Sequence, residues 1–303
     1  MGATEKQKKI RELLKEKNAI LLAHYYQRDE IQDIADILGD SLALSIEAAR
    51  TDADIIVFAG VLFMAESAAI LSPDKTVLLP VLEAGCPLAD KITAAELNEA
   101  KEENLGAKVV TYVNSSAETK ALSDICCTSA NAVQVVNSLA GAEKVIMVPD
   151  GNLARYTARL TDKEIIPWKG FCYVHDNLST EAVEKVKDEH PDALFAAHPE
   201  CRLEVLDLAG FVGSTGGILR FARETDAGEI IVGTEMGIMH QLKEENPGKT
   251  FIPASENMVC HDMKKITLDD ILSSLLEMKH IIEVPEDVRI PANRALKRML
   301  EVS

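Results

Sequence analysis

Three cysteines lie at nearly even intervals along this chain of 303 residues. Cys86 and Cys172 are 86 residues apart, and Cys172 and Cys260 are 88 residues apart. This regularity indicates three related units, each of which brings one thiol to a common point. Three thiolates on one metal centre would leave a coordination position open for chemistry.

Two kinds of metal centre suit three cysteine ligands. Catalytic zinc is tetrahedral and keeps one position for water or substrate. A 4Fe–4S cluster is normally held by four thiolates, so three of them leave one iron exposed as a Lewis acid for hydroxyl or carboxylate oxygens. The spacing alone does not choose between zinc and iron–sulfur. It also does not exclude three buried thiols that are kept at equivalent positions of a repeat.

The other three cysteines lack this pattern. Cys126 and Cys127 are adjacent and precede a predicted helix, and we interpret them as buried small residues. Cys201 follows Glu200 near a predicted strand end but has no equivalent in the other units, so it ranks lower as a ligand. The N-terminal segment is charged and amphipathic, unlike a signal peptide. A cytoplasmic, reducing location is therefore expected, in which thiols stay free or bind metal.

Polar side chains follow the first apolar run of each unit. They are His24 and Tyr26, then Tyr112 and Asn114, then His198 and Glu200. Functional loops converge at the carboxyl ends of strands in α/β sheets, so these side chains are expected to surround one central active site. Glu200 is a candidate general acid or base. His175, three residues after Cys172, is expected to line the same pocket.

Hydroxyl side chains stand just before predicted helices at a matching position of each unit: Ser41, Ser129, Ser214 and Thr215. Some of them are expected to be N-caps. A helix N-terminus with a hydroxyl is also an anion site, so three converging ones could hold two carboxylates and a phosphate. The paired glycines after Thr215 would let a ligand approach the backbone closely.

Three apolar runs recur in each unit and predict its strands. They cover residues 18–26, 54–60 and 75–80, then 107–115, 143–148 and 163–167, then 193–201, 229–233 and 249–253. Short β-branched runs bounded by turn residues fit strands that are buried on both faces. Strands that alternate with helices form parallel sheets. We therefore predict an α/β fold of three α/β/α three-layer units with small parallel sheets, arranged with pseudo-threefold symmetry around the active site.

The predicted units span residues 1–88, 89–174 and 175–263. Amphipathic helices are expected at 4–17, 93–104, 180–190 and 267–279, and Thr4 and Thr93 have the spacing of a capping box. Residues 291–299 predict a short basic helix. We expect the C-terminal helices of residues 264–303 to pack on the first unit.

The composition limits the partners. The net charge is −17, which argues against nucleic acid, because phosphate-backbone binding requires a basic face. No run approaches the roughly 20 apolar residues that span a membrane. Helix N-termini and a metal can still create a local positive site. Small-molecule substrates are therefore expected, with the chain as a monomer or a homodimer.

The chain resembles the quinolinate synthase family over nearly its whole length. The matching stretches are HYYQ at 24–27, IADILGDS at 34–41, VFAG at 57–60, FMAE at 63–66, YVNS at 112–115, TSANA at 128–132, PDGNL at 149–153, GFCYVH at 170–175, HPEC at 198–201 and STGG at 214–217. The family has a pseudo-threefold α/β/α fold and one 4Fe–4S cluster per chain, held by one cysteine from each domain. The resemblance implies Cys86, Cys172 and Cys260 as its ligands.

The resemblance also implies a reaction. In NAD biosynthesis from aspartate, the family condenses iminoaspartate with dihydroxyacetone phosphate to quinolinate and releases phosphate and two waters, with the open iron as Lewis acid. Tyr26, Glu200 and His198 would then be the catalytic residues. The implied substrate-binding residues are His24, Ser41, Tyr112, Asn114, Ser129, His198, Glu200 and Thr215, together with His175.

Two positions depart from the family pattern, and two other functions stay open. Tyr25 stands where the family commonly has Asn, and Arg220 where relatives can have Lys; Arg binds an anion with a different, bidentate geometry. The alternatives are a zinc-dependent lyase that uses the same three cysteines and an iron–sulfur redox sensor without turnover. For the synthase, an oxidase or a dehydrogenase that produces iminoaspartate is a possible handover partner.

Overall fold

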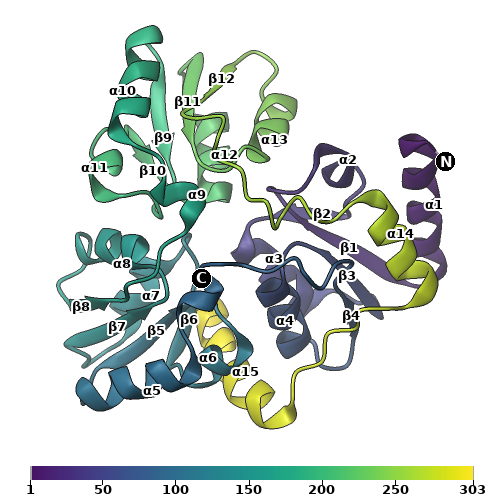
Figure 1. The fold of residues 1–303 in the computed structure, drawn as a ribbon, viewed down its shortest axis with the longest axis horizontal. Helices are drawn as coiled ribbons and strands as arrows, with labels where there is room; N and C mark the ends of the chain where they lie inside the picture. The colour runs from purple at the N-terminus through teal and green to yellow at the C-terminus, as the bar shows by residue number, and fades with distance from the viewer. Residues whose placement is uncertain (1, 303) are drawn as a thin grey trace.

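The computed structural model describes residues 2–302, which form three lobes that meet at the centre of the molecule (Figure 1). The first lobe contains α1 Ala3–Glu16, β1 Ala19–His24, α2 Asp29–Gln32, β2 Ile37–Gly39, α3 Ser41–Arg50, β3 Ile55–Ala59, α4 Leu62–Leu71 and β4 Thr76–Leu78. The second contains η1 Ala89–Lys91, α5 Ala94–Glu103, β5 Lys108–Tyr112, α6 Ala117–Ala121, β6 Ile125–Cys127, α7 Ala132–Ser138, β7 Lys144–Val148, α8 Gly151–Ala158 and β8 Glu164–Pro167. The third contains α9 Tyr173–Asp176, α10 Thr180–Glu189, β9 Leu194–Ala197, α11 Leu203–Leu206, β10 Phe211–Val212, α12 Thr215–Glu224, β11 Glu229–Gly233, α13 Ile238–Glu245 and β12 Thr250–Pro253. Two further helices follow, α14 Leu268–Glu277 and α15 Glu286–Val302.

The three sheets share one topology. Each is parallel and four-stranded, with strand orders β2-β1-β3-β4, β6-β5-β7-β8 and β10-β9-β11-β12. Helices connect successive strands within each lobe, as parallel pairing requires. The predicted α/β class with three similar units is confirmed. The unit boundaries at residues 88, 174 and 263 stay a prediction.

Burial explains why these runs form strands. In β3, β7 and β11, every residue after the first is buried. Such strands are covered on both faces and must be apolar throughout, which the β-branched runs of the sequence provide. Each sheet also has a short edge strand, β2, β6 or β10, that the apolar runs did not predict. These strands have only three, three and two residues, too few to show a pattern.

The structure confirms one of the two predicted capping boxes. Thr93 caps α5, with its side chain bonded to the N–H of Glu96 and the Glu96 side chain bonded back to Thr93. The box at Thr4 was wrong, because α1 begins one residue earlier, at Ala3, and its N-cap Gly2 has no side chain to offer.

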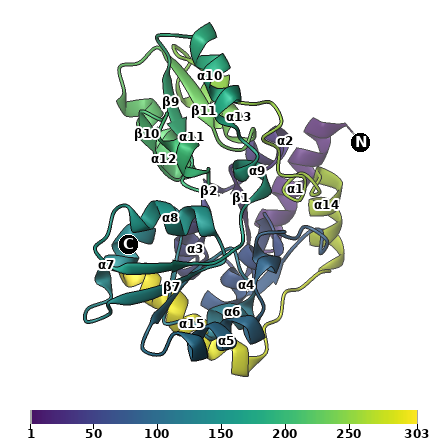
Figure 2. The same ribbon diagram turned by 60° about the vertical axis from the view of Figure 1, so that its left-hand side comes forward.

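The C-terminal helices lie in two different places. Helix α14 packs on α1 of the first lobe, whereas α15 packs against α4 of the first lobe and against α6 and β6 of the second (Figure 2). Asn293 Nδ2 donates to the carbonyl of Ile70 at 2.6 Å, and Arg298 donates to the carbonyl of Asp124 at 2.6 Å. Helix α15 therefore joins two lobes rather than resting on the first alone, and it is longer than the predicted helix at 291–299.

Replacing Leu296 in α15 with alanine is expected to lower the free energy of unfolding by about 2–5 kcal/mol, because its side chain is fully buried in the hydrophobic core. Urea denaturation of the purified variant measures the change. Lys297→Ala, the exposed next residue of the same helix, is the control and should stay within about 0.5 kcal/mol of the wild type. Equal effects of the two changes would contradict the placement of α15.

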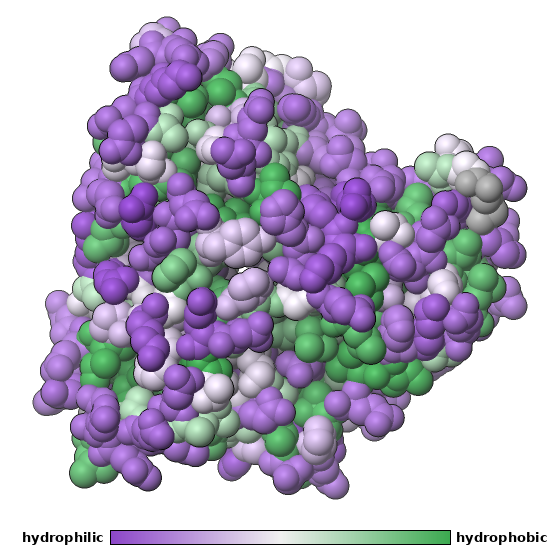
Figure 3. Space-filling model, viewed as in Figure 1, coloured by the Kyte–Doolittle hydropathy of each residue, from purple (hydrophilic) through white to green (hydrophobic). Residues whose placement is uncertain are grey.

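Polar side chains cover most of the face seen in Figure 3, with smaller apolar areas between them. This distribution fits the net charge of −17. Among the helices of residues 2–302, none combines the length and the apolar character that crossing a membrane requires.

Candidate active site

A cavity lies where the three lobes meet, and side chains from all three lobes line it. It contains every residue of the predicted site: His24, Tyr26, Ser41, Cys86, Tyr112, Asn114, Ser129, Cys172, His175, His198, Glu200, Thr215 and Cys260. Ser214, the other hydroxyl considered, is not part of the lining. Cys126, Cys127 and Cys201 are buried elsewhere.

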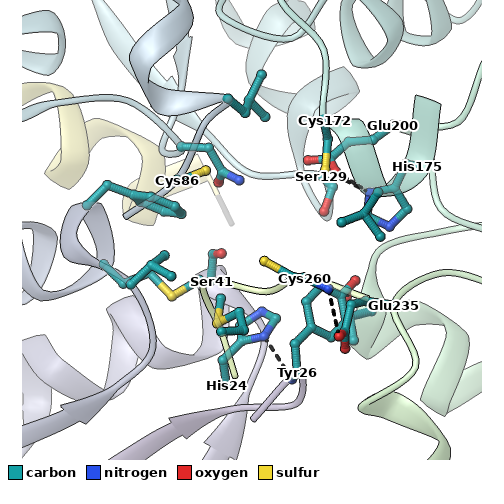
Figure 4. Close-up of a pocket in the computed structure, with 18 of the residues that line it drawn as sticks. His24, Tyr26, Ser41, Cys86, Ser129, Cys172, His175, Glu200, Glu235 and Cys260 are labelled. Atoms are coloured by element: carbon teal, nitrogen blue, oxygen red, sulfur yellow. Dashed lines mark hydrogen bonds and ion pairs between the residues drawn. The ribbon is translucent and has the colours of Figure 1, made fainter. Parts of the chain in front are cut away.

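The three evenly spaced cysteines occupy the loops that follow β4, β8 and β12. Each is partly buried, and the sulfurs of Cys86, Cys172 and Cys260 face the open centre of the cavity (Figure 4). Burial raises the pKa of all three thiols. A metal at this point would reverse that effect, because coordination deprotonates a thiol outright. Three soft sulfur donors around one space suit an iron–sulfur cluster or zinc.

A second set of possible metal ligands overlaps the first. One ligand atom each of Cys172, His175 and Glu200 lies within 4.8 Å of the others. His175 Nδ1 is 2.6 Å from Glu200 Oε2 and 3.3 Å from Cys172 Sγ, so these groups already satisfy one another. An ion held by all three would have to replace those contacts. The three-cysteine set is the one that the repeat explains.

His24 and His198 occupy equivalent strand ends, and each accepts a hydrogen bond at Nδ1 from the backbone N–H two residues later. The N–H of Tyr26 donates to His24 Nδ1 at 3.1 Å, and the N–H of Glu200 donates to His198 Nδ1 at 3.3 Å. Burial lowers the pKa of both histidines to about 3. A neutral ring whose Nδ1 accepts a hydrogen bond carries its proton on Nε2. Each histidine therefore presents an uncharged donor, which in His198 lies 3.1 Å from Ser129 Oγ.

Glu200 is a buried carboxylate that accepts hydrogen bonds from two side chains. His175 Nδ1 approaches it at 2.6 Å, and the Tyr112 hydroxyl donates a second hydrogen bond. Burial opposes its ionisation, but the electrostatic interactions with His175 and His198 and these two hydrogen bonds outweigh burial and lower the pKa of Glu200 to about 2. The group is therefore held ionised in the wall of the cavity.

Tyr26 presents a neutral phenol. Burial raises its pKa well above the usual value, although its hydroxyl lies 2.7 Å from Thr215 Oγ1 and 2.7 Å from Thr234 Oγ1. Thr234 Oγ1 is also 2.9 Å from His175 Nε2. A continuous line of hydrogen-bonding groups thus runs from Tyr26 through Thr234 and His175 to Glu200.

Two helix N-termini meet at Asp40. Its Oδ1 accepts the N–H of Ala43 at 3.1 Å and caps α3, so Ser41 lies in the first turn of the helix rather than at the cap. Its Oδ2 accepts the Ser214 hydroxyl at 3.0 Å and the N–H of Gly216 at 3.3 Å. Ser214 is the N-cap of α12, as expected for some of these hydroxyls.

Sequence reasoning missed several residues of this region: Asp40, Asp150, Thr234, Glu235 and Lys264. Two of them, Asp150 and Glu235, could be recognised from their equivalent positions in the repeat. Asp150 and Glu235 each stand two residues after the equivalent strands β7 and β11. The Cys172 N–H donates to Asp150 Oδ2 at 3.2 Å, and the Cys260 N–H donates to Glu235 Oε1 at 3.0 Å. The repeat therefore pairs a carboxylate with a cysteine in two of the lobes.

The two departures from the family pattern lie outside the cavity lining. Tyr25 and Arg220 border a separate hollow that shares Asp40 with the active-site cavity. Burial raises the pKa of Tyr25 to about 12. Both side chains therefore belong to this neighbouring hollow and not to the cavity that the three cysteines line.

The chain is similar over nearly its whole length to proteins named quinolinate synthase. The family model described as quinolinate synthetase A protein matches residues 8–301. Quinolinate synthase of Geotalea uraniireducens is 59% identical over 293 residues, covering 97% of this chain and 96% of that protein. Quinolinate synthase 1 of Methanosarcina acetivorans is 55% identical over 295 residues, 97% of each chain, and quinolinate synthase of Alkaliphilus metalliredigens is 52% identical over 303 residues, 100% of each. The matched length and these identities, together with the triplicated fold, show that the chain belongs to the quinolinate synthetase A protein family.

Proposed function

We propose that the chain condenses iminoaspartate with dihydroxyacetone phosphate to form quinolinate, with release of phosphate and two waters. The names of its relatives support this reaction. The observation that carries the proposal is the cavity where three thiols, two neutral histidines, a neutral phenol and an ionised carboxylate converge from three lobes. Such a site combines anion recognition with acid–base chemistry.

The proposed cofactor is one 4Fe–4S cluster held by Cys86, Cys172 and Cys260. Its support is the donor set: one thiol comes from each lobe, and no other cysteine of residues 2–302 lines the cavity. When bound, such a cluster supplies an open iron as a Lewis acid for hydroxyl or carboxylate oxygens. The threefold arrangement would provide three equivalent ligands, Cys86, Cys172 and Cys260, and would leave one iron without a protein ligand.

The substrate-binding groups divide by chemistry. His24 and His198 offer Nε2–H donors, and Ser41 and Thr215 lie in first turns of helices, where backbone N–H groups favour anions. Asn114 carries a buried Oδ1 without a hydrogen-bond partner among the described residues. A buried unsatisfied acceptor is costly, so Asn114 Oδ1 is suited to accept a hydrogen bond from a hydroxyl or imine N–H of the substrate.

Glu200 and Tyr26 are proposed as the acid–base groups. The lowered pKa of Glu200 keeps the group ionised, so that a carboxylate oxygen is present to accept a proton. The raised pKa of Tyr26 keeps its phenol protonated and able to donate. Isomerisation and loss of water need both functions in one site. The imine itself requires an earlier oxidation of an amino acid, which an oxidase or a dehydrogenase would supply.

Anaerobically purified protein is expected to be brown, to contain about four irons and four sulfides per chain, and to form quinolinate from the two substrates. The control is the same protein after removal of the metal, which should be inactive. Full activity in a colourless zinc protein would overturn the proposed cofactor and leave the zinc-dependent lyase. An intact cluster without product in a single-turnover assay would overturn the reaction and leave the redox sensor.

A further inference from the structure

Glu235 is a fully buried carboxylate whose two oxygens are both engaged. Its Oε1 accepts the N–H of Cys260 at 3.0 Å, and its Oε2 accepts the N–H of Gly237 at 2.7 Å. Lys264 Nζ lies 3.2 Å from Oε1. Although Glu235 lines the cavity, it has no free oxygen for a substrate. Its contacts instead fix the backbone of the segment that carries Cys260.

Lys264 extends this contact from the third lobe to the first. Its Nζ donates to the carbonyl of Tyr26 and lies 3.5 Å from the carbonyl of Gln27. Its own carbonyl accepts two hydrogen bonds from the Arg28 guanidinium, at 2.7 Å and 3.0 Å. The ion pair of Glu235 and Lys264 thus stands between the main chain of the proposed catalytic Tyr26 and that of the proposed ligand Cys260.

The packing around this ion pair leaves no spare space. A Cβ atom added at Gly237 would lie 2.7 Å from Lys264 Nζ, 2.7 Å from Tyr26 Cα and 2.8 Å from Glu235 Oε2. Gln32 reinforces the junction, since its Nε2 donates to the carbonyls of Tyr25 and Gly237, both at 3.0 Å. The loop after β1 and the loop after β11 are therefore locked together at one point.

The second lobe contains an equivalent contact between a carboxylate and the N–H of its cysteine. Asp150 occupies the position equivalent to Glu235 and accepts the N–H of Cys172 at 3.2 Å. The equivalent position of the first lobe is Val61, which cannot accept a hydrogen bond. In two of the lobes, a carboxylate accepts the N–H of the central cysteine. This recurrence indicates that the carboxylate serves to hold the cysteine in place. Of these two carboxylates, Glu235 is the one paired with a lysine, Lys264, which also reaches the first lobe.

We propose that Glu235 and Lys264 are positioning residues that set Cys260 relative to Tyr26. The segment between β12 and α14 contains turns but no helix or strand, so side-chain contacts have to hold Cys260 in place. A buried ion pair that loses one partner leaves an uncompensated charge and is strongly disrupted. Displacement of a reacting group by about 1 Å can cost about 100-fold in rate. This proposal rests on the proposed function for its kinetic part only.

The first test uses metal-free protein and is independent of the reaction. Amide hydrogen exchange of residues 254–264 is expected to become at least about tenfold faster in Glu235→Ala, with a smaller effect in Glu235→Gln, which keeps one acceptor oxygen. Lys249→Met is the matched control, because Lys249 also binds two backbone carbonyls, Ala222 and Thr225, in the same lobe but away from the cysteines. Unchanged exchange at Cys260 in Glu235→Ala would overturn the proposal.

The second test uses reconstituted protein. In Glu235→Gln and Lys264→Met, the rate of cluster loss to a chelator should rise about 10- to 100-fold, and kcat should fall about 10- to 100-fold while KM changes less than about threefold. The double variant should be no worse than the worse single variant, because the two residues act as one unit. Rates of cluster loss and kcat values equal to those of Lys249→Met would overturn the proposal, even if thermal stability falls. An inactive wild type would refute the proposed function but leave the exchange result valid.

Discussion

Replacing Cys86, Cys172 or Cys260 with serine is expected to abolish assembly of the proposed 4Fe–4S cluster. Each thiol comes from a different lobe, so no neighbouring cysteine can take over when one is lost. Serine offers a harder oxygen that binds iron poorly. Iron and sulfide per chain should fall at least about tenfold after anaerobic reconstitution, with loss of the brown absorption. Quinolinate formation should fall with it.

Cys126→Ser is the matched control for this prediction. Cys126 is a fully buried thiol in β6 and lies outside the cavity lining. The change places a hydroxyl in an apolar site, so it is expected to lower stability while the cluster content stays near that of the wild type. Equal loss of iron in Cys126→Ser and Cys172→Ser would count against the ligand assignment. Retention of a full cluster in any one of the three ligand variants would refute it.

Much of the architecture could be predicted from the repeat. Buried parallel strands are apolar along most of their length, so β1 and β3 and their equivalents stand out as runs, and the edge strand β4 and its equivalents carry shorter apolar runs. The carboxyl ends of the first strands of the three lobes carry His24, Tyr112 and His198, and all three side chains line one cavity. Function lies at the strand ends because loops from every lobe can reach them.

Other features depend on contacts that no local pattern records. The apolar face of α15 shows that the helix is buried, but not that it packs on both α4 and α6. Asp40 and Lys264 gain their roles from partners 174 and 238 residues away. Thr234 is a single hydroxyl after a strand, with nothing to set it apart until the structure places it between Tyr26 and His175. Only the carboxylates Asp150 and Glu235 could have been found earlier, from their equal repeat positions.

Replacing Glu200 with glutamine is expected to lower kcat about 10²- to 10⁴-fold while the cluster content stays unchanged. Glutamine has nearly the same shape and keeps one acceptor oxygen for Tyr112 or His175. It cannot accept a proton at neutral pH, so the acid–base function is removed. Glu204→Gln, an exposed carboxylate in the neighbouring helix α11, is the matched control and should keep wild-type kcat.

The kinetic pattern of Glu200→Gln separates two roles that the geometry allows. If Glu200 transfers a proton, kcat and kcat/KM fall together and a weak exogenous base restores part of the rate. If Glu200 only orients His175 near Cys172, the iron content or the cluster spectrum changes with the rate, because His175 Nδ1 lies 3.3 Å from the Cys172 sulfur. A large fall of kcat with an unchanged spectrum therefore assigns the proton transfer to Glu200. A kcat within about threefold of the wild type would remove Glu200 from the acid–base chemistry and leave Tyr26 as its remaining proposed group.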